Sequence, residues 1–202
     1  LQETHWTSET VMTIVRNHYT FILPPAGHRG VQGVGLAIRN DLFGSLTTLH
    51  PYSPRVLRAG VLGKGRSLNI IVADAPTNTV YELESNRKEY YQTLQQAVDD
   101  CDSQAVKVIL TDANAEIGND RTVAPAVLGP YGLPSQNDRP DESPNGEQFL
   151  TFCMTNNFII GYSWFPKPKA AQKYTFYPSD SNRVPKVIDH ILIDARSKSC
   201  LL

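Results

Sequence analysis

The chain has 202 residues, of which 41% are hydrophobic and 19% charged, and its formal net charge is −1. This composition is typical of a globular protein and excludes a disordered or fibrous chain, while the near-zero charge favours no particular partner. No apolar run approaches the roughly 20 residues of a membrane-spanning helix, so we expect no membrane contact. The length predicts one domain over residues 1–202.

The two ends of the chain and its cysteines bear on the cellular context. Residues 1–6 contain no initiator Met and no basic-then-apolar leader, so we expect the chain to come from the interior of a longer protein. Its three cysteines are widely spaced, which favours reduced thiols in an intracellular protein over a disulfide framework or a zinc site.

Apolar and often β-branched runs of strand length recur between turn residues. They predict strands at 34–38, 68–73, 106–111, 158–162 and 187–193. Several of these runs are apolar throughout, which is typical of strands that are buried on both faces.

Two helices are predicted between these strands. From Tyr81 to Cys101 apolar residues recur at steps of three and four, which predicts a helix with one face on a sheet. That face would hold Leu83, Tyr90, Leu94, Ala97, Val98 and Cys101. A second helix would follow Asn145, with a face formed by Phe149, Leu150, Cys153 and Met154. Strands that alternate with helices and long loops predict an α/β sandwich.

Acidic residues lie at or near the ends of predicted strands. Glu3 lies near the start of the chain, Asp112 directly follows a strand with Asn114 two residues later, and Asp189 lies within the last strand. A carboxylate at the carboxyl end of a buried strand is where α/β folds place ligands, and Mg²⁺ binds one or two such carboxylates together with waters. The plainer alternatives are a solvated Glu3, a capped turn at Asp112 and an edge pair at Asp189. Because side chains alternate along a strand, Asp189 and His190 point to opposite faces, and Asp189 is the candidate.

The stretch 164–198 combines basic and aromatic residues, with Lys167 and Lys169 between Trp164 and Tyr177. Cations interleaved with aromatic rings suit the backbone and bases of a nucleic acid. The alternative is a solvated loop with a few core aromatics.

Seven short motifs, in one order along the chain, resemble those of the endonuclease/exonuclease/phosphatase superfamily. They are Leu-Gln-Glu-Thr-His-Trp at 1–6, Gly-Val-Gly-Leu-Ala-Ile-Arg at 33–39, Ile-Val-Ala-Asp-Ala-Pro-Thr at 71–77, Thr-Asp-Ala-Asn-Ala-Glu-Ile-Gly at 111–118, Asn-Gly at 145–146 with Phe-Leu-Thr-Phe-Cys at 149–153, Tyr-Thr-Phe at 174–176 and Ile-Asp-His-Ile-Leu at 188–192. The wording is most similar to endonucleases of non-LTR retrotransposons and to the craniofacial-development-protein-like sequences derived from them. The resemblance covers nearly the whole chain and implies a two-sheet, DNase-I-like α/β sandwich.

The resemblance also implies Mg²⁺-dependent hydrolysis of phosphodiester bonds in DNA. Glu3 would bind Mg²⁺, which offsets the charge that grows on the phosphate. Asp112 would orient and help to deprotonate the attacking water, and Asn114 would position the scissile phosphate. Thr175 would give nearby polar support, and Asp189 would hold a catalytic histidine through its ring N–H.

The sequence departs from the family pattern at both ends and at three internal positions. The first strand of the family and its final Ser-Asp-His, which supplies the catalytic histidine, would lie outside residues 1–202, so we expect a domain that is incomplete at both termini and impaired in cleavage. Asp74 replaces a tyrosine on the substrate side, where a carboxylate repels phosphate unless it recruits metal or is protonated. Thr111 and Ala113 replace Gly and Phe, and the lost Phe side chain would cost roughly 3–5 kcal/mol in a packed core.

The leading interpretation is a DNA-nicking endonuclease of retrotransposon origin that acts inside the cell, with the nucleus as a candidate compartment. A non-catalytic remnant or nucleic-acid-binding module is the alternative that Asp74 and the missing histidine element favour. A phosphatase of the same superfamily is a second alternative, against which the basic and aromatic stretch favours a polymeric substrate.

Overall fold

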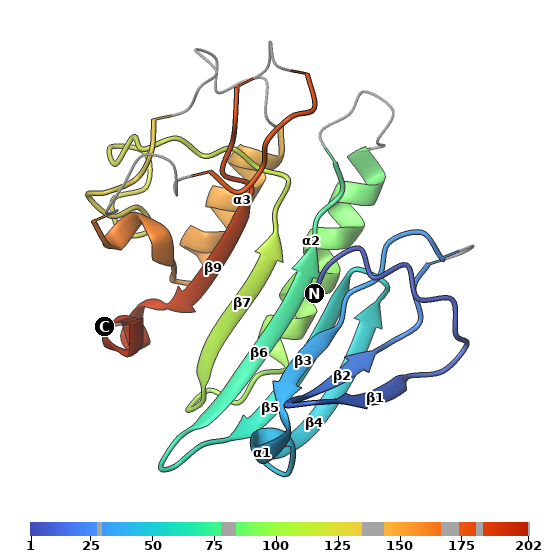
Figure 1. Ribbon diagram of the computed structural model, residues 1–202. Helices are drawn as coiled ribbons and strands as arrows, with labels where there is room; N and C mark the ends of the chain where they lie inside the picture. The colour runs from blue at the N-terminus through green and yellow to red at the C-terminus, as the bar shows by residue number, and fades with distance from the viewer. Residues whose placement is uncertain (28–29, 78–83, 135–143, 167–173, 181–183, 202) are drawn as a thin grey trace. The chain divides into compact units, whose positions relative to one another are not determined.

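The structure is a computed structural model that describes residues 1–27, 30–77, 84–134, 144–166, 174–180 and 184–201 (Figure 1). The chain divides into two compact units, the first formed by Leu1–Ala75 with Glu84–Thr111 and the second by Pro76–Leu83 with Asp112–Leu202. The single domain expected over residues 1–202 stays a prediction.

A small antiparallel sheet opens the first unit. Its strands are β1 (Met12–Arg16), β2 (Tyr19–Leu23) and β3 (Leu36–Arg39), in the order β1-β2-β3. Asn17 lies in the two-residue turn between β1 and β2 with a φ of 45°, a left-handed conformation that Asn tolerates better than most residues. The short helix α1 (Asn40–Phe43) follows β3.

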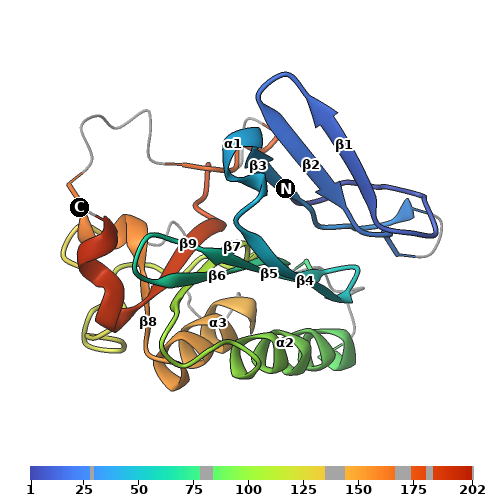
Figure 2. The ribbon, with the colours of Figure 1, turned by 90° about the horizontal axis from the view of Figure 1, so that it is seen from below.

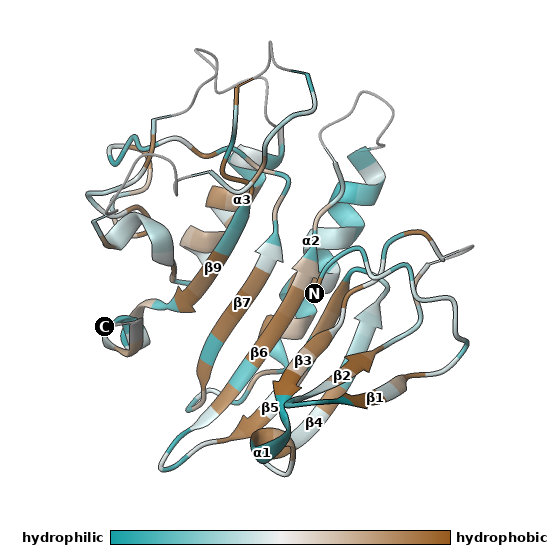
Figure 3. Ribbon diagram, in the orientation of Figure 1, coloured by the Kyte–Doolittle hydropathy of each residue, from teal (hydrophilic) through white to brown (hydrophobic). Residues whose placement is uncertain are grey.

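Four strands of a larger sheet belong to the first unit. They are β4 (Leu46–Ser53), β5 (Val56–Leu62), β6 (Ser67–Asp74) and β7 (Val106–Asp112), in the order β4-β5-β6-β7. β5 pairs antiparallel with both β4 and β6. The strands predicted at 68–73 and 106–111 are therefore confirmed as β6 and β7, and Figure 3 shows how apolar both are.

The core of the first unit forms where its two sheets face each other. The buried side chains of this cluster are Ile22, Val34, Leu36, Ile38, Leu57, Ala59 and Val72. Figure 2 shows β1–β3 on one side of the larger sheet and α2 (Glu84–Asp99) on the other. α2 packs on β4, β5 and β6 with the predicted residues Tyr90, Leu94, Ala97 and Val98 buried. The expected two-sheet α/β fold is confirmed, while Tyr81 and Leu83 lie outside the described residues.

The second unit holds the remaining elements, β8 (Phe158–Ile160), η3 (Gly161–Trp164), β9 (Asp189–Asp194), η5 (Ala195–Leu201) and α3 (Pro144–Thr155). β8 pairs antiparallel with β9, from Phe158 opposite Asp194 to Ile160 opposite Leu192. The predicted strand at 158–162 ends early, because residues 161–164 turn into a 3₁₀-helix.

α3 packs on β8, and the prediction for one residue of its apolar face, Met154, is wrong. Phe149 and Cys153 are buried as expected, but Met154 is 42% exposed and Phe152 is buried instead. At 3.6 residues per turn, positions 149, 152 and 153 share a face that position 154 leaves. Within the described residues, no helix combines the length and the apolar character that crossing a bilayer requires.

Candidate functional site

The segment after β7 runs beside the segment that leads into β9, and predicted site residues gather there in the second unit. The amide of Ala113 donates a hydrogen bond to the carbonyl of Ile188 over 2.8 Å. The Thr175 hydroxyl accepts hydrogen bonds from the amides of Ile188 and Asp189, each at 3.1 Å. Asp112, Thr175 and Asp189 are far apart in sequence, but these contacts place their backbones next to one another.

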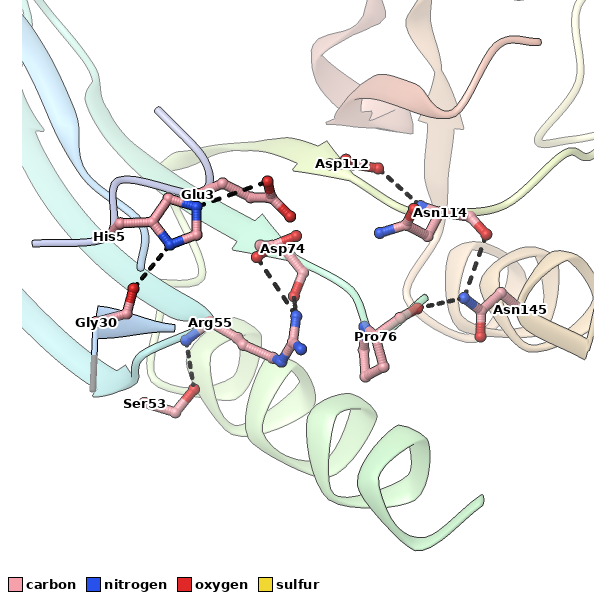
Figure 4. A network of polar contacts seen from close by, with 10 residues as sticks. All are labelled: Glu3, His5, Gly30, Ser53, Arg55, Asp74, Pro76, Asp112, Asn114 and Asn145. Atoms are coloured by element: carbon pink, nitrogen blue, oxygen red, sulfur yellow. Dashed lines mark hydrogen bonds and ion pairs between the residues drawn. The ribbon is translucent and has the colours of Figure 1, made fainter. Parts of the chain in front are cut away.

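The turn after β7 is held from two sides. One carboxylate oxygen of Asp112 accepts the amide of Asn114 at 2.9 Å, and Asn114 has a left-handed φ of 44°. The fully buried Asn145 donates through its side-chain amide to the carbonyl of Asn114 at 3.2 Å and to that of Pro76 at 2.7 Å (Figure 4). The capped turn considered as the plainer alternative is thus present, and it leaves both the Asp112 and Asn114 side chains half-buried.

Ala113, between them, is buried with 1% exposure. The alanine therefore lies in the core, at a position where the resemblance led us to expect Phe. Its backbone amide nevertheless makes the bond to Ile188 that joins the two segments.

Alternation along β9 is as predicted, with Asp189 exposed and His190 only 3% exposed. The Nε2 atom of His190 lies 3.1 Å from the carbonyl oxygen of Ala115, and since a carbonyl can only accept, Nε2 donates. The ring centroid lies 5.0 Å from that of Phe149 and 5.6 Å from that of Tyr162. His190 is therefore a core residue, while the assigned role of Asp189 stays a prediction.

An ion pair lies beside this cluster, between the Glu116 carboxylate and the Lys186 ammonium at 3.2 Å. Both residues line a small pocket together with Tyr162 and Tyr174. Burial, and to a lesser extent the charge of Glu116, raises the pKa of Tyr162 well above its ordinary value, so that its phenol stays neutral. Lys186, one cation of the basic stretch, is thus already engaged within the protein.

Other parts of the predicted nucleic-acid surface differ in how they are placed. Phe176 forms an isolated bridge with Lys186. Phe176 and the next residue, Tyr177, are 43% and 58% exposed. This exposure fits the predicted stacking on bases. Lys167 and Lys169 lie outside the described residues.

Glu3 belongs to the first unit, on an N-terminal segment that pairs with residues 32–35. The amides of Thr4 and His5 donate to the carbonyls of Gly33 and Gln32, both at 3.0 Å. The Glu3 side chain is 66% exposed, and its carboxylate lies 3.9 Å from Nε2 of His5 (Figure 4). Both residues have left-handed φ values, 48° and 51°, each of which costs a residue other than glycine roughly 1–2 kcal/mol.

Asp74, the last residue of β6, is 2% exposed and paired with Arg55. One guanidinium nitrogen, Nη1, lies 3.4 Å from the Asp74 carboxylate and donates to its backbone carbonyl at 3.1 Å. The backbone amide of Asp74 in turn donates to the carbonyl of Arg55 at 3.0 Å. The negative charge of Asp74 is therefore offset by Arg55. From the sequence we had considered only a bound metal or protonation of the carboxylate.

The implied Mg²⁺ can be tested against the donor atoms of the described residues. Among them, no group of three or more His, Cys, Asp or Glu side chains is arranged to hold a metal ion. A single exposed carboxylate, as Glu3 provides, is compatible with Mg²⁺, because this ion keeps most of its waters and needs only one or two protein carboxylates. The residues present thus fit a weakly held, largely hydrated ion.

In comparison with known proteins, no family model matches the chain. Craniofacial development protein 2 from Tragulus javanicus and from Bos taurus are each 27% identical over 167 residues, or 83% of this chain. That alignment covers 27% and 26% of those proteins, so the chain spans about a quarter of the length of these curated relatives.

Solved structures give the fold. The endonuclease domain of TRAS1, a telomere-specific non-LTR retrotransposon, matches with a TM-score of 0.57 and 11% identity over 92% of this chain and 73% of that domain. The chain has a DNase-I-like fold. The AP endonuclease LMAP from Leishmania major matches this DNase-I-like chain with a TM-score of 0.58 and 12% identity, over 92% of this chain and 64% of that enzyme. The resemblance to retrotransposon endonucleases and to craniofacial-development-protein-like sequences is confirmed.

Two residues that hydrogen-bond to candidate site residues, Asn145 and Arg55, had no role assigned from the sequence. Asn145 organises the turn after β7, and its sequence signal was its place in the Asn-Gly motif at 145–146. Arg55 lies in the turn between β4 and β5, and no motif marked it.

Proposed function

We propose that this DNase-I-like chain is a Mg²⁺-dependent phosphodiesterase that nicks DNA. The observation that carries the proposal is the gathering of Asp112, Asn114, Thr175 and Asp189 around the hydrogen bond between Ala113 and Ile188. These residues come from three distant stretches, and together they offer a base, amide and hydroxyl groups for a phosphate, and a second carboxylate. The endonuclease names of the structural neighbours support the same chemistry.

In this proposal the second unit performs proton transfer and phosphate positioning. Asp112 orients the attacking water and accepts its proton, while the capped turn fixes the direction of the carboxylate. Asn114 donates to a non-bridging phosphate oxygen, and Thr175, whose hydroxyl already accepts two amides, donates its own proton toward the same group. Asp189 accepts a hydrogen bond from a catalytic imidazole and fixes its tautomer.

In the first unit, Glu3 is the proposed ligand of Mg²⁺. When bound, the ion supplies positive charge that stabilises the developing negative charge on phosphate and leaving oxygen. Asp74 is the proposed residue on the substrate side, and Arg55 keeps its carboxylate from repelling the DNA backbone.

DNA is the proposed substrate because of the exposed aromatic rings next to Thr175. Phe176 and Tyr177 present faces on which bases can stack, and a small phosphorylated molecule would need no such extended surface. The flanking lysines of the basic stretch would add contacts with the backbone.

The test is nicking of supercoiled plasmid with Mg²⁺, comparing the 202-residue chain with Asp112→Ala. Asp120→Ala, which removes an exposed carboxylate from the same connection, is the matched control. We expect slow, impaired nicking by the parent chain and by Asp120→Ala and none by Asp112→Ala, while all three bind a fluorescent DNA duplex equally in EDTA. Binding without nicking by any of them would instead identify a non-catalytic nucleic-acid-binding module.

A further inference from the structure

Glu3 and His5 are neighbouring side chains that can both bind a metal ion. The proposed reaction assigns a role to Glu3 and none to His5. The Nε2 atom of His5 and a carboxylate oxygen of Glu3 are 3.9 Å apart, beyond hydrogen-bonding distance. Both side chains are more than half exposed, at 58% and 66%, so solvent and ions reach them.

The hydrogen bond at the other ring nitrogen defines what Nε2 can do. Nδ1 of His5 lies 2.7 Å from the carbonyl oxygen of Gly30. A carbonyl oxygen can only accept, so Nδ1 carries the hydrogen, and in the neutral ring Nε2 keeps its lone pair. A backbone carbonyl that fixes the tautomer in this way is the usual arrangement around a metal-binding histidine.

The backbone at both residues adopts a conformation that is unfavourable for residues other than glycine. Glu3 and His5 both adopt left-handed φ angles, and the segment is kept there by the hydrogen bonds of Thr4 and His5 to Gly33 and Gln32. Strain that persists because the surroundings impose it is typical of functional positions. Here its effect is to bring a carboxylate and an imidazole nitrogen, two residues apart, to the same place (Figure 4).

We propose that His5 is a second protein ligand of the cation at Glu3 and that the pair favours Mn²⁺ over Mg²⁺. Carboxylate oxygens serve both ions, but an imidazole nitrogen adds affinity for transition metals and little for Mg²⁺. The inference rests on the proposed function only through the assignment of the cation to Glu3. It adds a ligand and a metal preference that neither the motifs nor the comparisons supply.

The experiment is a titration of the 202-residue chain with Mn²⁺, in which electron paramagnetic resonance reports the free ion, followed by displacement with Mg²⁺. The decisive variant is His5→Asn. Asparagine keeps a donor for the Gly30 carbonyl and tolerates a left-handed φ, but it has no nitrogen at the Nε2 position. His18→Asn, in the exposed turn after β1, is the control, and Glu3→Gln tests the carboxylate.

We expect His5→Asn to weaken Mn²⁺ binding about tenfold and to leave Mg²⁺ binding within about twofold, while His18→Asn changes neither. Glu3→Gln should weaken both ions. In nuclear magnetic resonance spectra of the parent chain, trace Mn²⁺ should broaden the ring signals of His5 and spare those of His18.

Other outcomes separate this inference from the proposed function. Equal Mn²⁺ affinity in the parent chain and His5→Asn overturns the role of His5 and leaves Glu3 as the cation residue. If Glu3→Gln also changes nothing, or if the parent chain binds no Mn²⁺, the cation is not at Glu3 and the inference fails. Mg²⁺-dependent nicking that requires Asp112 would still support the phosphodiesterase in either case.

Discussion

Removal of Arg55 should destabilise the protein through the charge that it leaves behind. The Asp74 side chain is 3% exposed and that of Arg55 19% exposed, so Arg55→Ala leaves a carboxylate that is almost entirely buried without its cation. Breaking a buried ion pair from one side typically costs about 3–5 kcal/mol of unfolding free energy. Because Arg55 is partly hydrated and its contact is long, at 3.4 Å, we expect the lower end, about 3 kcal/mol.

The partner variant should cost less, and the pair should show coupling. Asp74→Asn leaves a guanidinium that still reaches solvent and still donates to the carbonyl of residue 74, so a loss of about 1–2 kcal/mol is expected. In a double-mutant cycle the two substitutions should couple by about 1–2 kcal/mol. For a chain of this length a loss of about 3 kcal/mol lowers the melting temperature by roughly 6–12 °C.

Urea unfolding followed by circular dichroism and tryptophan fluorescence measures these quantities. Arg39→Ala is the control, because its pair with Asp41 is shorter, at 2.6 Å, but exposed on both sides, and exposed pairs contribute little. Comparable losses from Arg39→Ala and Arg55→Ala, or additive effects at positions 55 and 74, would show that burial of Asp74 does not set the energy. The offset of its charge by Arg55 would then be wrong.

Three further outcomes follow from burial and backbone geometry. Cys200 is exposed, whereas Cys101 and Cys153 are buried and have raised pKa values. One thiol should therefore react rapidly with a disulfide reagent in the native protein, and three should react in denaturant. Rapid reaction of a second thiol in the native protein would contradict the described core. Gly33→Ala should lower stability by more than about 1 kcal/mol, because Gly33 has a φ of 114° and an added Cβ would collide with the Thr4 hydroxyl. Gly65→Ala, also at positive φ but in open space, measures the backbone contribution alone in the same melts. Burial raises the pKa of Tyr162. The contribution of the neutral Tyr162 phenol to stability is therefore full below the ordinary tyrosine pKa of about 10 and is lost as the pH rises above that value. Above about pH 10, urea midpoints should fall more steeply for the parent chain than for Tyr162→Phe.

The sequence predicted β3, β6, β7, β8 and β9, and it missed β1, β2, β4 and β5. β6 and β7 carry continuous apolar runs, which is why both were predicted. β1 is almost wholly exposed, and β4 contains Pro51 and several polar residues. Both end a row of strands, where polar residues and proline are tolerated, so neither shows the pattern of a central strand.

The candidate site was likewise only partly predictable from the sequence. Asp112 and Asn114 follow a strand that the sequence already marked, so their place was predictable from local pattern. The contacts around them were not, since Asn145 reaches the carbonyl of Pro76 across 69 positions. Arg55 and Asp74 are likewise separated by 19 positions, and nothing in a linear pattern indicates that one neutralises the other.

The substitutions at positions 74 and 113 leave a main-chain hydrogen bond in place at each position. Each was judged against the side chain that the family carries at that position. In the folded chain the backbone of each position makes a bond that is independent of the side chain, from Ala113 to Ile188 and from Asp74 to Arg55. At each of these two positions a main-chain group therefore holds its neighbour independently of the motif side chain.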